Sequence, residues 1–437
     1  MKYLPIDNDL FVQNRKKLKE KLKPNSVAIF NSNDILPTSA DGTMPFIQDA
    51  NIFYLSGIDQ EESILLLAPD FPDERFREVL FLKETSELIA IWEGHKYTVE
   101  EAQETSGVQS ILWLDKFEST LNMILAETEN IYLDSNEHIR NSSPVETRND
   151  RFVKWCKNTY PIHEYNRIAP HIYDLRCIKS EKEVALIQQA CDITEKAFRR
   201  VLDKTRPGVW EFELEAEYSH EFLRRRSRGF AYDPIIASGA NACVLHYITN
   251  NQQCQDGDLL LMDVGAEYAN YNADMTRAIP VNGRFTKRQK DVYNAVLRVK
   301  KEATKLLVPG SSIPEYHKAV GEVMEKELLG LGLLDKTDIK NQKPDWPAYK
   351  KYFMHGTSHH LGINVHDVAS VYKKFEAGMV FTVEPGIYIR EEAIGIRLED
   401  NVVITNDGHI NLMKNIPLEA DEIEELMNAN SSTHLEY

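Results

Sequence analysis

Four histidines and two well-placed glutamates lie close together between residues 354 and 400. Apolar runs precede Glu384 and Glu399, and the polar segment 390–392 separates the runs, so the pattern predicts a β-hairpin. A turn centred on residues 391–392 would place Glu384 opposite Glu399, with Cβ atoms roughly 4.5–5.5 Å apart. Two carboxylates at that distance repel each other, and a bound metal ion would relieve the repulsion. The spacing therefore predicts a metal site on this hairpin.

An earlier stretch, residues 258–277, repeats this arrangement with aspartates. A hairpin centred on Tyr268 and Ala269 would place Asp263 opposite Asp274 on one face of the sheet. Asp263 follows an apolar run, where a charge without a partner is costly to bury, and this favours a ligand role. Four carboxylates and one histidine suit two cations about 3.5–4 Å apart better than a single cation. Together the two hairpins predict a dinuclear hydrolytic centre.

Five short motifs carry a resemblance to a known family. They are LMDVG, NADMTR, HGTSHHLG, TVEPG and RLED, in this order. They are similar to the successive metal-site motifs of the pita-bread metallopeptidases, the group of methionine aminopeptidase, prolidase and Xaa-Pro aminopeptidase (aminopeptidase P). The resemblance implies that Asp274 and Glu399 bridge two divalent metal ions, that Asp263 completes one site, and that His359 and Glu384 complete the other. A carboxylate-rich set with one imidazole favours Mn²⁺, with Zn²⁺, Co²⁺ and Fe²⁺ as alternatives.

The resemblance also implies catalytic residues around the metals. Glu384, beside the bridging water, is expected to take a proton from the nucleophile and deliver it to the leaving nitrogen. His355 and His366 resemble histidines that line the proline side of the cleft and hold the scissile carbonyl or the tetrahedral intermediate. His246 resembles the histidine that contacts the substrate next to the metals. An imidazole can donate a hydrogen bond to a developing oxyanion, which is the chemistry needed there.

Three further residues are candidates for binding the substrate. Arg397 lies two residues before Glu399 and therefore on the same strand face. It is expected to shape the carboxyl-terminal side of the substrate, to form a salt bridge to one of the acids, or to do both. Tyr388 is separated from Glu384 by an even number of positions, so the two side chains are expected on the same strand face. Tyr388 would either face the cleft or pack in the core. Asp41, in a polar loop, is a candidate for lining the site across a subunit contact.

The predicted reaction is hydrolysis of the amino-terminal Xaa-Pro bond of peptides by a hydroxide that bridges the two metals. The nitrogen of proline carries no hydrogen, so a peptidase that must bind the amide hydrogen fails on this bond. Prolidase, which cleaves Xaa-Pro dipeptides, is the alternative within the family, and the serine of HGTSHHLG favours aminopeptidase P over it. A creatinase-like hydrolase and a catalytically silent binding protein are alternatives from other classes. Proteins of either class are expected to have lost acidic metal ligands. All five expected metal ligands are present in this sequence.

The length of 437 residues predicts two domains. Apolar runs of strand length alternate with helical patterns up to a boundary near residue 175, which predicts an α/β domain over residues 1–175. Strands are expected at 27–30, 52–55, 64–67, 79–82, 88–91 and 131–133, and helices at 9–22, 98–104 and 116–127. The stretch 46–59 resembles part of the N-terminal domain of aminopeptidase P, which methionine aminopeptidase lacks.

Residues 176–437 contain two copies of one series of signals, offset by about one hundred residues, which is too long for a solenoid repeat. Each copy has two helical patterns separated by Pro-Gly, then a histidine, then a hairpin with two acids; Ser180 and Glu183 form a predicted capping box at the first helix. The repeat agrees with the resemblance, which implies an α+β pita-bread catalytic domain with internal pseudo-twofold symmetry.

Composition limits the partners. The chain has 68 acidic and 51 basic residues, a net charge of −17, which disfavours binding to nucleic acid or anionic membranes. No apolar run approaches the roughly 18–20 residues of a membrane span, and the first residues lack the apolar core of a signal peptide. Its five cysteines show no CxxC spacing and are expected to be reduced. We therefore expect a cytoplasmic protein, and the resemblance implies a homo-dimer or tetramer.

Overall fold

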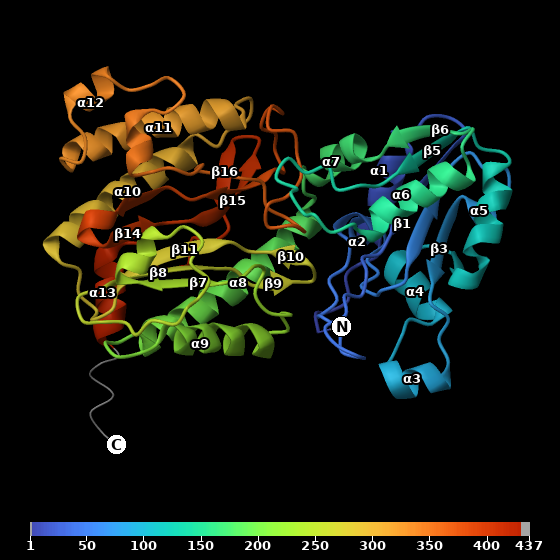
Figure 1. Ribbon diagram of the computed structural model, residues 1–437, viewed down its shortest axis with the longest axis horizontal. Coiled ribbons are helices and arrows are strands. Elements are labelled where there is room, and N and C mark those ends of the chain that lie inside the picture. Colours follow the sequence, from blue (N-terminus) through green and yellow to red (C-terminus); the bar gives the residue numbers. More distant parts are fainter. Residues whose placement is uncertain (1, 430–437) are drawn as a thin grey trace. The chain divides into compact units, whose positions relative to one another are not determined.

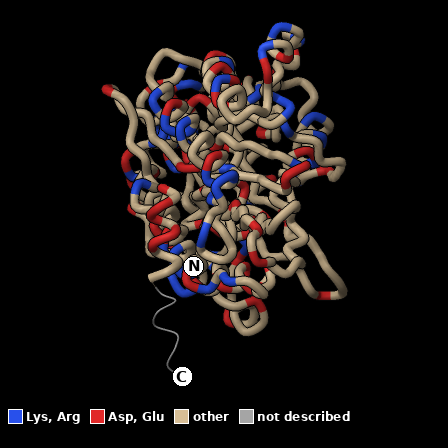
Figure 2. Tube along the Cα trace, turned by 90° about the vertical axis from the view of Figure 1, so that its left-hand side faces the viewer, with Lys and Arg blue, Asp and Glu red and all other residues tan. Residues whose placement is uncertain are grey.

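The computed structural model describes residues 2–429, which form two compact units (Figure 1). The first unit runs from Tyr3 to Arg176, and the second begins at Cys177. Within the described residues we find no helix with the length and apolar composition that a membrane-spanning helix requires. Figure 2 shows acidic and basic positions interspersed along the chain.

The first unit is built around a six-stranded mixed sheet with the strand order β4-β3-β2-β1-β5-β6. The strands are β1 (Ser26–Asn31), β2 (Ile64–Leu67), β3 (Glu78–Leu82), β4 (Ser110–Trp113), β5 (Asn130–Leu133) and β6 (Glu164–Arg167). The helices are α1 (Asp9–Lys19), α2 (Ala50–Ser56), α3 (Glu87–Glu93), α4 (Val99–Ser106), α5 (Phe117–Leu125), α6 (Arg148–Thr159) and α7 (Ala169–Arg176). Strands β1 and β2 are buried over their whole length because both lie inside the sheet, which explains their continuous apolar runs.

Two predicted strands of this unit are wrong, because residues 52–55 and 88–91 lie in helices α2 and α3. Both helices are fixed by caps at their amino-terminal ends. The Asp49 carboxylate accepts hydrogen bonds from the backbone N–H groups of Asn51 and Ile52, and Gly57 ends α2 in the left-handed region with φ 68°. The Ser86 hydroxyl accepts from Ile89 in α3. These short-range signals outweigh the strand preference of the apolar runs.

A buried polar cluster lies between α2 and the end of β5. The side-chain amide of Asn51 donates to both carboxylate oxygens of Asp134 at 3.1 and 2.8 Å, and Arg176 donates to the same Asn51 side chain at 2.6 Å. Burial, followed by the nearby charge of Asp49, raises the pKa of Asp134 to about 8. The carboxyl group therefore holds its proton more tightly in the folded protein than in the unfolded chain.

This shift predicts how stability depends on pH. Because the folded state binds the extra proton, stability falls as the pH rises from about 4 to about 8. We expect the midpoint of thermal unfolding to fall less over this range in Asp134→Asn, which removes the titration. The exposed Asp115→Asn is the matched control and should follow the wild type. Identical pH dependence in Asp134→Asn and the wild type would contradict the assignment.

The second unit places strands between two helix pairs, with α8 and α9 on one side and α10 and α11 on the other (Figure 1). Its helices are α8 (Glu181–Lys204), α9 (Glu211–Arg224), α10 (Lys287–Lys305), α11 (Ile313–Gly330), α12 (Lys336–Lys340) and α13 (Ala420–Ala429). Its strands are β7 (Ile235–Ser238), β8 (Leu259–Val264), β9 (Glu267–Tyr268), β10 (Tyr271–Asn272), β11 (Met275–Pro280), β12 (Val380–Val383), β13 (Gly386–Ile389), β14 (Ile394–Arg397), β15 (Asp400–Thr405) and β16 (Gly408–Asn411). The predicted capping box of Ser180 and Glu183 is present at α8.

The hairpin that carries the two glutamates has the predicted register. Strand β12 pairs with β15, β13 pairs with β14, and both ladders share one register on either side of a short break. Continued through the break, this register places Glu384 opposite Glu399. The turn lies at Arg390–Glu392, and Ala393 completes it in the left-handed region with φ 51°. The prediction of two opposed glutamates is confirmed.

The predicted register of the aspartate hairpin is wrong. Asp263 pairs with Thr276, two positions beyond Asp274. The turn is formed by Ala269 and Asn270, both in the left-handed region with φ 54° and 65°, one position later than predicted. Such a two-residue turn matches the twist of the strands. Because a register shift of two residues preserves the side-chain face, Asp263 and Asp274 still share a face, although they are diagonal neighbours.

Candidate metal centre

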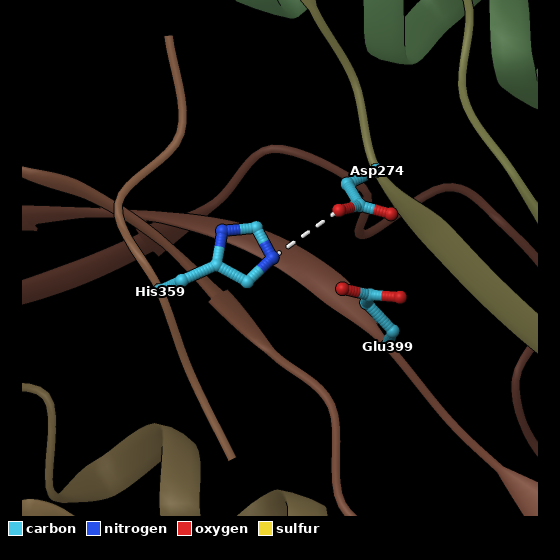
Figure 3. A group of neighbouring side chains, drawn as sticks. All are labelled: Asp274, His359 and Glu399. Atoms are coloured by element: carbon cyan, nitrogen blue, oxygen red, sulfur yellow. Dashed lines mark ion pairs between the residues drawn. The ribbon is translucent and has the colours of Figure 1, made fainter. Parts of the chain in front are cut away.

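Asp274, His359 and Glu399 form the centre of the site, and their side chains point toward one another (Figure 3). One potential ligand atom from each lies within 4.8 Å of the others. His359 Nε2 is 3.4 Å from Asp274 Oδ2. Asp274 precedes β11, Glu399 lies between β14 and β15, and His359 lies in the segment before β12, so three separate segments of the second unit meet here. This grouping fits side chains that share a cation.

The backbone around His359 fixes the direction of its ring. His359 donates its N–H to Thr382 Oγ1 at 3.1 Å, and its carbonyl accepts from the Thr382 N–H at 3.0 Å. Its Nδ1 lies 2.9 Å from the carbonyl oxygen of His360, which makes Nδ1 the protonated nitrogen. Nε2 then faces the carboxylates, and it is the nitrogen that could bind a metal ion.

Two hydrogen-bonding residues join the aspartate hairpin to the glutamate hairpin. The Asn401 side chain accepts from the Asp274 N–H at 3.0 Å and donates to the Asp274 carbonyl at 2.7 Å. Thr276 donates its hydroxyl to Glu399 Oε2 at 2.6 Å and accepts the Glu399 N–H at 3.0 Å. These contacts hold Asp274 and Glu399 in place on both sides of the site.

Tyr232 is a site residue that the sequence analysis missed. Its hydroxyl lies 2.6 Å from Asp263 Oδ1 and 2.5 Å from Asp274 Oδ1, so it connects the two aspartates. A hydroxyl has one proton and can donate to one of these oxygens at a time. The other oxygen receives no proton from Tyr232, and a cation shared by both aspartates would supply positive charge there.

We expect Tyr232→Phe to weaken metal binding by roughly 10–100-fold, the effect typical of losing an outer hydrogen bond to a metal ligand. The ring would still fill its space, so the fold should remain intact. Titration of the metal-free protein with Mn²⁺, followed by calorimetry, measures the change. Tyr247→Phe, which removes a hydroxyl that bonds to Glu211 instead, is the matched control. Equal Mn²⁺ affinity of Tyr232→Phe and the wild type would contradict this role.

The acids of the site favour protonation in the absence of a cation. Burial raises the pKa of Asp274, Glu384 and Glu399, and repulsion from neighbouring carboxylates adds to this; the pKa of Glu384 reaches about 7. Among residues 2–429, no lysine or arginine forms an ion pair with any of these three carboxylates. His359 and Arg397 offset this repulsion only in part, and bound cations would supply further positive charge.

Asp263 has a different partner. Arg397 donates to Asp263 Oδ2 at 2.5 Å and to the Tyr388 hydroxyl at 2.7 Å. The Tyr388 hydroxyl in turn lies 2.7 Å from His355 Nε2. Burial, followed by the charge of Arg397, lowers the pKa of His355 to about 3, so this imidazole is neutral and accepts the tyrosine proton. Arg397 thus forms the expected salt bridge and lies beside the site, while Tyr388 is buried within the same network.

The remaining predicted residues lie around this group. Glu384 Oε1 is 3.7 Å from His359 Nε2, and Glu384 Oε2 is 3.7 Å from His355 Nδ1. The ring of His366 packs edge-on against that of His359, with centroids 4.2 Å apart, and His366 is solvent-exposed. His246 is also exposed, just after the 3₁₀-helix Gly239–Cys243. His366 thus lies beside the central group, and His246 lies close enough to His355 for its charge to act on that imidazole.

Asp41 is an exposed residue of the first unit, in the loop between β1 and α2. Its predicted role in lining the site stays a prediction.

Comparison with known proteins places this geometry in a family. Residues 185–406 match the model of metallopeptidase family M24, and residues 11–132 match the N-terminal domain of aminopeptidase P. The chain belongs to metallopeptidase family M24. It is 36% identical to the Xaa-Pro aminopeptidase of Haemophilus influenzae, over 97% of this chain and 98% of that one.

Solved structures of family members have the same fold. Aminopeptidase P from Escherichia coli with the inhibitor Pro-Leu matches with a TM-score of 0.87 and 33% identity, over 98% of this chain and 100% of the other. The zinc-substituted E. coli enzyme in complex with product matches with a TM-score of 0.87 and 33% identity, over 98% and 99%. The predicted fold, an N-terminal α/β domain followed by a pita-bread catalytic domain, is confirmed. The chain is a hydrolase, a metal-dependent aminopeptidase.

Proposed function

We propose that this protein cleaves the amino-terminal residue from peptides with proline in the second position, using two divalent metal ions. The observation that carries the proposal is the buried group of Asp274, His359 and Glu399, with its raised carboxyl pKa values. The names of the relatives, which are Xaa-Pro aminopeptidases, support the choice of substrate.

The proposed ligand set is Asp263, Asp274, His359, Glu384 and Glu399. Four carboxylates and one imidazole form a hard, oxygen-rich site, so we propose Mn²⁺ as the native metal. The E. coli enzyme has also been prepared with zinc, so the fold accepts more than one metal. When bound, two such ions would lower the pKa of a water and polarise the scissile carbonyl.

The residues around the ligands then have separate tasks. Glu384 accepts a proton from the attacking water and passes it to the leaving nitrogen. His246 and His366, both exposed, donate to the substrate carbonyl as it gains negative charge. His355 is held neutral beside Tyr388, and it lines the part of the cleft that receives proline.

Arg397 and Tyr388 shape the carboxyl-terminal side of the substrate pocket in this proposal. Arg397 is buried and already bound to Asp263, so its guanidinium is fixed in direction before a peptide arrives. A fixed donor costs less conformational entropy on binding than a free one. We also propose a homo-dimer or tetramer in which Asp41 lines the site across a subunit contact.

We further propose that residues 1–175 form a creatinase-like N-terminal domain and residues 176–437 the catalytic domain. A cytoplasmic location is proposed from the cysteines, since all five are buried and free of disulfides in the described residues. The partners proposed are peptides, with no nucleic acid and no membrane.

A substrate series tests the proposed function and separates it from prolidase. The Mn²⁺-loaded protein is assayed with an Xaa-Pro dipeptide, an Xaa-Pro-Yaa tripeptide and a tripeptide without proline. We expect the tripeptide with proline to be cleaved and the proline-free peptide to be left intact. Cleavage restricted to the dipeptide would identify a prolidase. Cleavage of none would reject a peptidase of this specificity.

A further inference from the structure

One buried carboxylate of the second unit lies outside the metal centre. Glu211, the first residue of α9, is fully buried. Its Oε1 accepts hydrogen bonds from the N–H and the hydroxyl of Ser238, both at 2.7 Å. Its Oε2 accepts from the Tyr247 hydroxyl at 2.8 Å and from the Gln252 N–H at 2.9 Å. An ionised carboxylate only accepts hydrogen bonds and has about four lone-pair sites, so these donors satisfy it fully.

The partners of Glu211 belong to two separate segments. Ser238 ends β7. The other two partners belong to residues 244–252, a segment that forms no helix or strand. The backbone N–H of Glu211 also donates to the Gln252 carbonyl at 3.0 Å. Because this segment lacks regular backbone pairing, its shape depends on contacts of this kind. Glu211 therefore holds residues 244–252 against the end of β7.

A negative charge is costly at a buried position, and here it makes the contacts stronger. The partners of Glu211 are all neutral, two backbone N–H groups and two hydroxyls. Hydrogen bonds to a charged acceptor are roughly twice as strong as those between neutral groups. Burial, followed by the bond to Glu211, raises the pKa of Tyr247 to about 12, so this hydroxyl keeps its proton and donates it. The carboxylate thus fixes Tyr247 more firmly than a neutral acceptor would.

Tyr247 directly follows His246, the histidine proposed to contact the substrate. His246 is exposed. The residues on either side of it, Leu245 and Tyr247, pack against a buried cluster that contains Tyr388. Tyr388 is hydrogen-bonded to His355, and the charge of His246 acts on that imidazole. His246 is thus held between two anchored neighbours, and a movement of Tyr247 would shift its ring relative to His355.

We propose that Glu211 is a positioning residue of the peptidase reaction and that it holds His246 at the substrate through Tyr247. The inference rests on the proposed function, in which His246 donates to the scissile carbonyl as that oxygen gains negative charge. Such a donor acts mainly in the transition state, and a misplacement of about 1 Å can lower the rate about 100-fold. Loss of the Glu211 contacts should therefore lower kcat and leave KM and Mn²⁺ affinity unchanged.

Two variants remove this support to different extents. In Glu211→Gln the shape is kept, but each oxygen of Glu211 faces a backbone N–H, so the amide nitrogen opposes a donor in either orientation. We expect kcat to fall about 100-fold in Glu211→Gln and about tenfold in Tyr247→Phe, which loses one of the donors. Glu213→Gln, an exposed change on the same helix, and Tyr165→Phe, which removes a half-buried hydroxyl of the first unit, are the controls. Both controls should keep the wild-type kcat.

A double-mutant cycle separates positioning from general destabilisation. His246→Ala should by itself lower kcat by about 10²–10³-fold, the range for a lost donor to an oxyanion. If Tyr247 acts through His246, adding Tyr247→Phe to His246→Ala should cause no further loss. The full-length, Mn²⁺-loaded protein is assayed with an Xaa-Pro-Yaa tripeptide, and calorimetry measures Mn²⁺ affinity in every variant.

Hydrogen exchange followed by mass spectrometry gives a readout that does not depend on activity. We expect faster exchange of residues 244–252 in Glu211→Gln and Tyr247→Phe, because the contacts that hold this segment are weakened. Exchange of β8 and β11, which carry or adjoin the aspartates of the metal centre, should be the same as in the wild type.

The inference is overturned if Tyr247→Phe keeps the wild-type kcat, or if it lowers kcat by the same factor with and without His246. Unchanged exchange of residues 244–252 in both variants would also overturn it. If the wild type cleaves the tripeptide and His246→Ala is fully active, the positioning role is rejected while the peptidase function stands. If the wild type cleaves no Xaa-Pro peptide, the proposed function is rejected and the role of Glu211 with it. Should Glu211→Gln fail to fold, Tyr247→Phe decides the question on its own.

Discussion

Glu399→Gln is expected to remove metal-dependent peptidase activity while leaving the metal-free protein at least as stable as the wild type. Glu399 is 1% exposed and lies among other carboxylates, so burial and their charge raise its pKa well above the ordinary value. A neutral amide of the same shape avoids that repulsion in the folded state. The same change takes away a charged ligand that would bridge two cations. We expect kcat/KM to fall by more than the roughly 10–100-fold that outer contacts of a metal site contribute.

A peptidase assay measures kcat/KM, and thermal unfolding with and without Mn²⁺ measures the stability and the metal binding. Metal binding stabilises the folded state by mass action, so the wild-type midpoint should rise on adding Mn²⁺ and that of Glu399→Gln should rise much less. Glu391→Gln makes the same chemical change on the exposed turn of the same hairpin and serves as the control. Wild-type Mn²⁺ affinity and activity in Glu399→Gln would show that this carboxylate is no ligand.

The opposition of Glu384 and Glu399 could be predicted because all the information is local. Alternating apolar residues give two strands, and a charged segment between them marks the turn. The turn at Ala269 and Asn270 carries a weaker signal, since it contains no glycine although both residues have positive φ. The predicted register was therefore two residues off. The prediction that the two aspartates share a face was nevertheless correct, because side chains in a strand alternate with a period of two.

Contacts between distant segments could not be predicted in this way. Tyr232 lies 31 positions before Asp263 and 42 before Asp274, and no local motif connects it to either. Its contact with both aspartates becomes apparent only when the pairing of β8 with β11 is known. The prediction of a strand at 52–55 was wrong for the opposite reason, because the residues that determine its conformation are close to it in the sequence. Asp49 and Gly57 bracket the apolar run as helix caps and determine its conformation.

Glu384→Gln is expected to lower kcat by about 10²–10⁴-fold, the range typical of losing a general acid or base, with a smaller change in KM. Glu384 lies at 3.7 Å from both His359 and His355, between a proposed ligand and a residue of the proposed proline pocket. The amide retains an oxygen that can bind metal but can no longer accept a proton. The exposed Glu376→Gln provides the matched control.

Metal content separates the two proposed tasks of Glu384, as a ligand and as a proton carrier. If the Gln variant binds two Mn²⁺ ions per chain and still loses turnover, proton transfer is the missing step, and Glu384→Asp should recover part of kcat because it restores a carboxylate. If kcat instead falls only in proportion to the metal lost, Glu384 acts as a ligand alone. The proton would then have to travel through another group, and His355, whose Nδ1 lies 3.7 Å from Glu384 Oε2, would be the first to examine.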